Sequence, residues 1–228
     1  MPRFGQFLHI NRLLNKGEQI VFRLALLGLI VGLFWFVSVF ASQYRVQVPS
    51  VGGRYVEAVV GSPELVNPIF AQLNDVDMDI VRLVYSGLMR IDTKQRIVPD
   101  LAASYTVSED KLVYTFMLRQ DVVWHDGEPF TADDVVYTIE AIQNEAVASP
   151  LRVSFEGVNV QAVDDFTVQF TLAEPFAPFL SSLTVGILPE HIWFDIAAER
   201  FRVTQKNLQP VGTGPFAFKK FTKDEEGL

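Results

Sequence analysis

The sequence predicts a globular part of the mixed α/β (α+β) class, preceded by one transmembrane helix. Residues 24–41 form an unbroken apolar run, and residues 54–228 mix strand-like and helix-like patterns without strict βαβ alternation. The N-terminal part and the globular part also differ in charge. Residues 1–45 hold five basic residues and one acid, and the remainder holds 14 basic and 26 acidic residues, for a net charge of −8. Such asymmetry indicates two environments.

The apolar run, LALLGLIVGLFWFVSVFA, has no polar face of the kind that a soluble helix shows. Its length as a helix is roughly 27 Å, close to the ~30 Å hydrocarbon core of a bilayer. Four of the five basic residues precede it, so the N-terminus is expected in the cytoplasm. We therefore expect a cytoplasmic segment (1–23), a transmembrane signal anchor (24–44), a linker (45–53) and an extracytoplasmic globular part (54–228).

Two other interpretations of the run stay open. Val39, Phe40 and Ala41 make a passable signal-peptidase site, but the run and the segment before it are long for a cleaved signal peptide. A buried core helix fits poorly, because the run is apolar all round and has charged flanks.

The amino-acid composition excludes some kinds of site and partner. The chain has no cysteine, which excludes disulfides and zinc–thiolate sites. The globular part is acidic, which argues against nucleic acid as a partner.

The elements of the globular part can be predicted in order. Residues 55–60 read as a strand, residues 77–88 have helical spacing, and residues 111–119 are rich in β-branched and aromatic side chains. Thr131 and Asp134 resemble a capping box. The helix that follows is expected to end near Asn144 and to bury Val135, Ile139 and Ile142.

The second half of the globular part is expected to begin with a hairpin of residues 157–163 and 166–172. Short helices over residues 176–183 and 190–198 and a strand from 216 to 221 follow. The spacing of Phe170, Phe176 and Phe179 places them in the core.

Four motifs could carry chemistry, and each is better explained by structure. His125 and Asp126 are adjacent on an Asp-Gly turn and seldom face each other there. Asp75, Asp77 and Asp79 begin like a calcium loop, but its required glycine and glutamate are absent. Residues 212–215 lack the Gly-Lys-Ser/Thr of a phosphate loop, and a lone His191 is more typical of a helix start than of a nickel site. We expect no catalytic residue, no metal site and no cofactor.

A series of short motifs stands in an order that resembles one known family. They are Gly61 to Pro68, ending in Asn-Pro; Val84 to Leu88; Pro99 to Ala102; Ser108 to Asp110; Phe116 to Arg119 with His125 to Gly127; Phe130 to Val135; Leu188 to His191; and Pro210 to Phe216. Together they resemble the family 5 solute-binding proteins of peptide and nickel ABC importers.

The resemblance implies a two-lobed fold like that of type II periplasmic binding proteins, closing on a ligand by a hinge. It implies no enzyme but a substrate-binding subunit that captures peptides, or another small solute, outside the cell membrane and delivers them to the permease subunits of the importer. The chain ends before the family's second lobe, so residues 54–228 are expected to be an incomplete, N-terminal part of that fold.

The resemblance also places candidate site residues. The loop after the first strand faces the cleft in the family, which makes Asn67 a candidate ligand contact by motif and Gln72, Leu73, Asn74 and Asp75 candidates by spacing. The last motif is expected to cross between lobes as a hinge, through Gly212, Thr213, Gly214 and Pro215.

Two other functions compete with this interpretation. A membrane-anchored hydrolase lacks support, because the sequence has no Gly-x-Ser-x-Gly or His-Glu-x-x-His motif. A degenerate scaffold or sensor on the same anchor, which no longer transports, remains the alternative.

Overall fold

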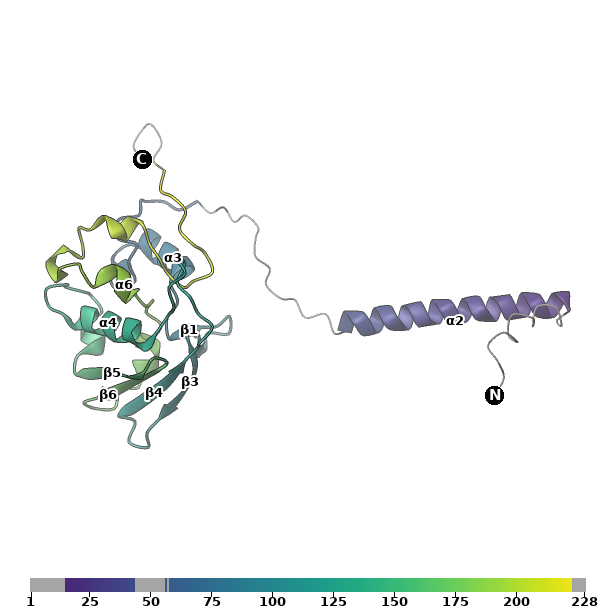
Figure 1. The fold of residues 1–228 in the computed structure, drawn as a ribbon, viewed down its shortest axis with the longest axis horizontal. Helices are drawn as coiled ribbons and strands as arrows, with labels where there is room; N and C mark the ends of the chain where they lie inside the picture. The colour runs from purple at the N-terminus through teal and green to yellow at the C-terminus, as the bar shows by residue number, and fades with distance from the viewer. Residues whose placement is uncertain (1–14, 44–55, 57, 223–228) are drawn as a thin grey trace. The chain divides into compact units, whose positions relative to one another are not determined.

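The computed structural model describes residues 15–43, 56 and 58–222 of the chain (Figure 1). The chain divides into two units, residues 1–57 and 58–228, and each is treated by itself.

The first unit contains helix α2 (Lys16–Gln43). Its first turn is capped: the Asn15 N–H donates to Glu18 Oε2 at 2.8 Å, and the Asn15 carbonyl accepts from the Gln19 N–H at 3.0 Å. By length and composition, residues 16–40 can cross a membrane, and none of this stretch is buried; a signal sequence meets the same criteria. The helix begins at Lys16, so residues 16–23 of the expected cytoplasmic segment are helical. The expected linker, residues 45–53, lies outside the described residues.

The second unit is built on a four-stranded antiparallel sheet in the order β3-β4-β6-β5. Its strands are β3 (Ala102–Val107), β4 (Val113–Leu118), β5 (Val158–Asp164) and β6 (Thr167–Leu172). Strands β5 and β6 form the expected hairpin, with Val160 opposite Phe170, and β4 confirms the strand expected there. A separate pair, β1 (Met89–Ile91) and β2 (Ile97–Pro99), was not predicted.

Helix α4 (Ala132–Gln143) packs against β5 and β6 and confirms the capping-box prediction. Thr131 and Asp134 form both bonds of the box, and Asn144 is the C-cap. Val135, Ile139 and Ile142 are fully buried, because α4 turns this apolar side toward the core that it shares with the sheet.

The remaining helices are short and lie mostly in the second half of the unit. Helix α3 (Asp75–Val84) precedes the sheet, and α5 (Phe179–Ser182) and α6 (Glu190–Trp193) follow it, shorter than predicted. The 3₁₀ helices are η2 (Ala71–Leu73), η3 (Arg152–Phe155), η4 (Ala198–Arg200) and η5 (Gln205–Leu208).

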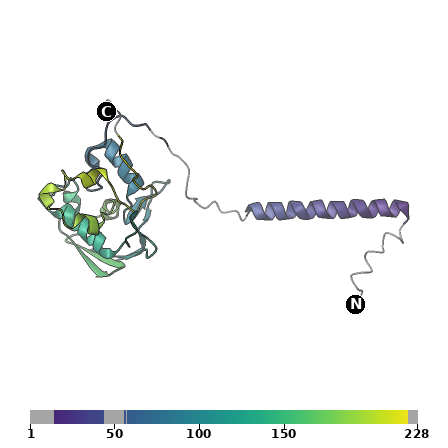
Figure 2. The same cartoon turned by 45° about the horizontal axis from the view of Figure 1, so that its top comes forward.

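Helix α3 ends four residues before the predicted end because another segment crosses it there. The last carbonyls of the helix, on Leu83 and Val84, accept hydrogen bonds from the N–H groups of Phe216 (3.1 Å) and Gly214 (2.8 Å). Figures 1 and 2 show this segment, in yellow, running beside α3. Tyr85 then leaves the helix in an extended conformation, with φ −113° and ψ 148°.

Three expectations about the core and the strands were wrong. Val56, residues 58–60 and residues 216–221 are not strands, because no other described segment pairs with them and a strand needs a partner for its backbone groups. Phe170 and Phe179 are fully buried as expected, but Phe176 is 39% exposed.

Candidate ligand-binding site

Asn67, the candidate ligand contact placed by motif, is fully buried and bonded within the chain. Its Oδ1 accepts from the Ile69 N–H at 3.1 Å, and its Nδ2 donates to Asn207 Oδ1 at 3.1 Å. Asn207 in turn donates to the Phe201 carbonyl at 2.7 Å. This chain of bonds joins the first loop to η5 and shapes that loop, and a direct contact between Asn67 and a ligand stays a prediction.

The other four candidates lie where η2 meets α3. Asn74 caps α3: its Oδ1 accepts from the Val76 N–H at 2.9 Å, and its Nδ2 donates to the Ser62 carbonyl at 3.2 Å. Gln72, Leu73 and Asp75 are exposed, so their side chains are accessible to a ligand.

A depression of about 350 Å³ opens beside Gln72. Parts of η2, α3 and η3 and residues 181–182 and 184–186 line it. Its polar side chains are Gln72, Arg82, Ser154, Ser181, Ser182 and Thr184. Within the described part of the chain, the three serine hydroxyls form no hydrogen bond, and Arg82 has only long contacts of 3.5 Å to Asp79 and to Met78 Sδ. Leu73, Asn74 and Asp75 do not line this depression. The depression therefore presents serine hydroxyls that are available for hydrogen bonds to a ligand, next to the predicted ligand contact Gln72.

A larger hollow of about 760 Å³ lies between the turn at His125 and Asp126 and residues 205–221. No residue predicted to contact a ligand lines it, so it is not the candidate site.

The expected interlobe segment is held tightly between α3 and the His125 turn. The Gly212 N–H donates to His125 Nδ1 at 3.2 Å, which leaves the imidazole proton on Nε2, 2.9 Å from the Gly214 carbonyl. A Cβ on Gly212 would lie 1.9 Å from the Val84 carbonyl oxygen, and one on Gly214 would lie 2.6 Å from that of Leu83. Glycine is required at both positions because the backbones touch, and a hinge role for Gly212, Thr213, Gly214 and Pro215 stays a prediction.

Sequence reasoning missed a His–Asp pair formed by a different histidine. His191 Nε2 lies 2.9 Å from Asp126 Oδ2, with both side chains partly exposed. Although partial burial acts to raise it, the pKa of Asp126 lies below its ordinary value because His191 and the Glu128 N–H bond to the carboxylate. No hydroxyl among the described residues bonds to His191, so the pair joins the turn to α6 and presents no activated nucleophile. The partners are 65 positions apart in the sequence, so no local pattern predicts the pair.

Asp134 joins three segments at the edge of α4. Its Oδ2 accepts from the Thr131 N–H (2.9 Å) and from Trp124 Nε1 (3.3 Å). Its Oδ1 accepts from the Glu190 N–H at 2.8 Å. Burial raises the pKa of Asp134, and these bonds oppose the rise. The sequence predicted only the bond within the capping box.

The aspartates that begin like a calcium loop are used differently. Asp77 is buried in α3, and its two carboxylate oxygens accept from the N–H groups of Glu64 (2.9 Å) and Leu65 (2.8 Å). No group of three His, Asp or Glu side chains among the described residues is placed to hold a metal ion.

The chain matches known proteins over most of its globular part. Residues 96–226 match the description "Bacterial extracellular solute-binding proteins, family 5 Middle". The dipeptide-binding protein of Escherichia coli (strain K12) is 36% identical over 188 residues, which cover 72% of this chain and 35% of that protein. The chain spans 26–35% of the length of the curated relatives that it matches.

Two solved structures show the same fold. NikZ from Campylobacter jejuni, in complex with Ni(L-His), is 38% identical with a TM-score of 0.65, over 72% of this chain and 32% of that one. The oligopeptide-binding protein AppA from Bacillus subtilis, in complex with a nonapeptide, is 29% identical with a TM-score of 0.67, over 72% and 33%. The mixed α/β globular part thus matches type II periplasmic binding proteins. By sequence and by fold, the chain belongs to the bacterial extracellular solute-binding proteins, family 5.

Proposed function

We propose that this chain contributes to the substrate-binding subunit of an ABC importer, capturing peptides outside the cytoplasm and delivering them to the permease. Members of family 5 are binding components of transporters rather than enzymes, and the similar proteins include a dipeptide-binding protein and an oligopeptide-binding protein. Helix α2 would hold the globular part at the outer side of the cell membrane.

The depression beside Gln72 is the observation that supports this function best. A peptide backbone presents alternating donors and acceptors, and a glutamine amide can match both at once. The serine hydroxyls of the depression can also donate or accept, and the guanidinium of Arg82 suits a carboxylate. By contrast, the buried polar side chains of Asn67, Asp77 and Asp134 bond to other parts of the chain.

The test is calorimetric titration of the full chain in a non-ionic detergent with dialanine, pentaalanine and a soluble nonapeptide. At least one is expected to bind saturably, and Gln72→Ala is expected to weaken binding about fivefold, the effect of roughly 1 kcal/mol for one hydrogen bond. Gln120→Ala, an exposed glutamine outside the depression, is the matched control and should leave affinity unchanged. If none of the peptides binds at millimolar concentration, the proposal is wrong.

A further inference from the structure

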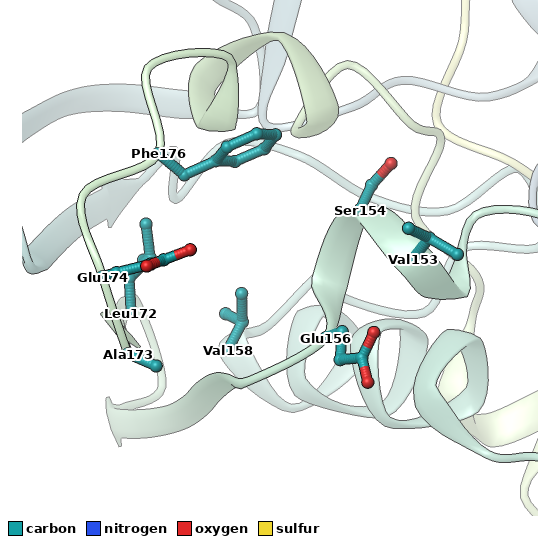
Figure 3. A pocket seen from close by; sticks show the side chains of 8 residues that line it. All are labelled: Val153, Ser154, Glu156, Val158, Leu172, Ala173, Glu174 and Phe176. Atoms are coloured by element: carbon teal, nitrogen blue, oxygen red, sulfur yellow. The ribbon is translucent and has the colours of Figure 1, made fainter.

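A further pocket, of about 430 Å³, lies between η3 and the adjacent ends of β5 and β6 (Figure 3). Val158 and Leu172 give it an apolar lining, and Phe176 and Val153 add exposed apolar surface. In Figure 3 the Phe176 ring lies over the pocket, the Glu174 carboxylate points toward its middle, and Glu156 lies at the opposite edge. The exposure of Phe176, against its predicted burial, is what leaves this pocket an aromatic wall.

The two glutamates of this pocket have no counter-ion among the residues that the structure describes. The described residues that line the pocket include no lysine, arginine or histidine. Within the described part of the chain, neither Glu156 nor Glu174 forms an ion pair, whereas the nearby Arg152 pairs with Glu145 at 2.6 Å. An apolar hollow edged by two unpaired carboxylates is complementary to a cation on a hydrocarbon stem.

The pocket adjoins the candidate ligand-binding site. Ser154, on η3, lines both this pocket and the depression beside Gln72. A peptide whose backbone lies along that depression can therefore extend a side chain past Ser154 into the pocket.

We propose that this pocket receives a lysine or arginine side chain of the bound peptide. The methylene stem would pack against Val158, Leu172 and Phe176, and the cation would lie near Glu156 and Glu174. The inference rests on the proposed function and adds to it a preference for peptides with a basic residue.

The test compares two peptides that differ by one charge. Ala-Lys-Ala and Ala-norleucine-Ala have side chains of similar length, and only the lysine carries an ammonium group. Calorimetric titration of the full chain in detergent should give a dissociation constant about fivefold lower for the lysine peptide, the size expected of a partly exposed ion pair. The preference should shrink as salt is raised, because ions screen exposed charges.

The Glu156→Gln/Glu174→Gln double variant separates charge from shape. It should bind the norleucine peptide as the unmodified chain does and lose the preference for lysine. Glu109→Gln, an exposed glutamate outside the pocket, should keep the preference. If both peptides bind the unmodified chain equally, or if the double variant still prefers lysine, the pocket is not a cation subsite and the proposed function stands. If neither tripeptide binds although dialanine, pentaalanine or the nonapeptide does, the cation subsite is wrong and the proposed function stands. If none of the five peptides binds, both proposals fail.

Discussion

His125 and Gly212 exchange two hydrogen bonds across 87 positions of the chain. The His125 N–H donates to the Gly212 carbonyl at 3.0 Å, and the Gly212 N–H donates to His125 Nδ1 at 3.2 Å. Nε2 of the same imidazole donates to the Gly214 carbonyl, and the Gly214 N–H donates to the Val84 carbonyl at the end of α3. The segment that carries Gly212 is thus bonded to two parts of the fold, which fixes the direction in which the chain continues.

Gly212→Ala is expected to lower the free energy of unfolding by about 2–3 kcal/mol, because its Cβ would overlap the Val84 carbonyl oxygen. Urea denaturation of the full chain in detergent, followed by near-UV circular dichroism, measures the change. Thr213→Val is the control from the same segment: the buried Thr213 Oγ1 has no hydrogen-bond partner among the described residues, so its removal should not lower the free energy of unfolding. If Gly212→Ala is as stable as the unmodified chain, the backbone at Gly212 does not lie as close to the Val84 carbonyl as the structure shows.

Asn67→Ala is expected to cost about 2–3 kcal/mol of stability, because it leaves the Ile69 N–H and Asn207 Oδ1 without their partner in the core. Gln72→Ala, on the exposed surface of the same loop, should change stability by less than about 0.5 kcal/mol. The same denaturation experiment compares the two. Equal, small effects would show that the buried amide does not hold the loop.

Glu190→Gln tests the acidic surface around α6. Burial, and then the neighbouring carboxylates of Asp133, Asp134 and Glu140, raise the pKa of Glu190 above its ordinary 4.5. Since the folded state holds this proton more tightly than the unfolded state, stability is lost as pH rises from about 4.5 through the folded pKa. The variant should therefore be more stable than the unmodified chain at pH 7, by a few tenths of a kcal/mol because the site is largely solvated.

The control for this comparison is Glu109→Gln, on an exposed turn remote from α6 in sequence. The advantage of Glu190→Gln should vanish at pH 4. An advantage that is the same at pH 4 and pH 7 would rule out the charge as its cause.

The local elements were predictable from the sequence because their signals lie within a few residues. Thr131 and Asp134 form one box, and residues 157–172 form one hairpin. The predictions failed where the partner is distant. Residues 216–221 have the composition of a strand, but a strand forms only if another segment pairs with it. Helix α3 ends before Tyr85 because a segment more than a hundred residues later in the sequence crosses it there. In the candidate site, spacing predicted Gln72, which borders the depression and whose contact with a ligand stays a prediction. Ser154, Ser181 and Ser182 carry no motif and come together only through η3 and α5.

The membrane role of α2 is tested by fractionation. A chain expressed in a bacterium with tags at both ends should keep both tags and stay in the membrane pellet after alkaline carbonate washing, because residues 24–41 are apolar on every side. Ile30→Arg with Val31→Arg, which puts two charges in the apolar run, should release it. Loss of the N-terminal tag would favour the cleaved signal peptide instead.

The central claim, that a peptide lies in the depression beside Gln72, is tested most directly by photocrosslinking. A nonapeptide carrying a diazirine is bound to the full chain in detergent and irradiated, and mass spectrometry locates the modified residues. We expect modification of Gln72, Ser154 and the segment of Ser181 and Ser182, competed away by the unlabelled peptide. Competed modification confined to the hollow between His125 and residues 205–221 would contradict the assignment of the site.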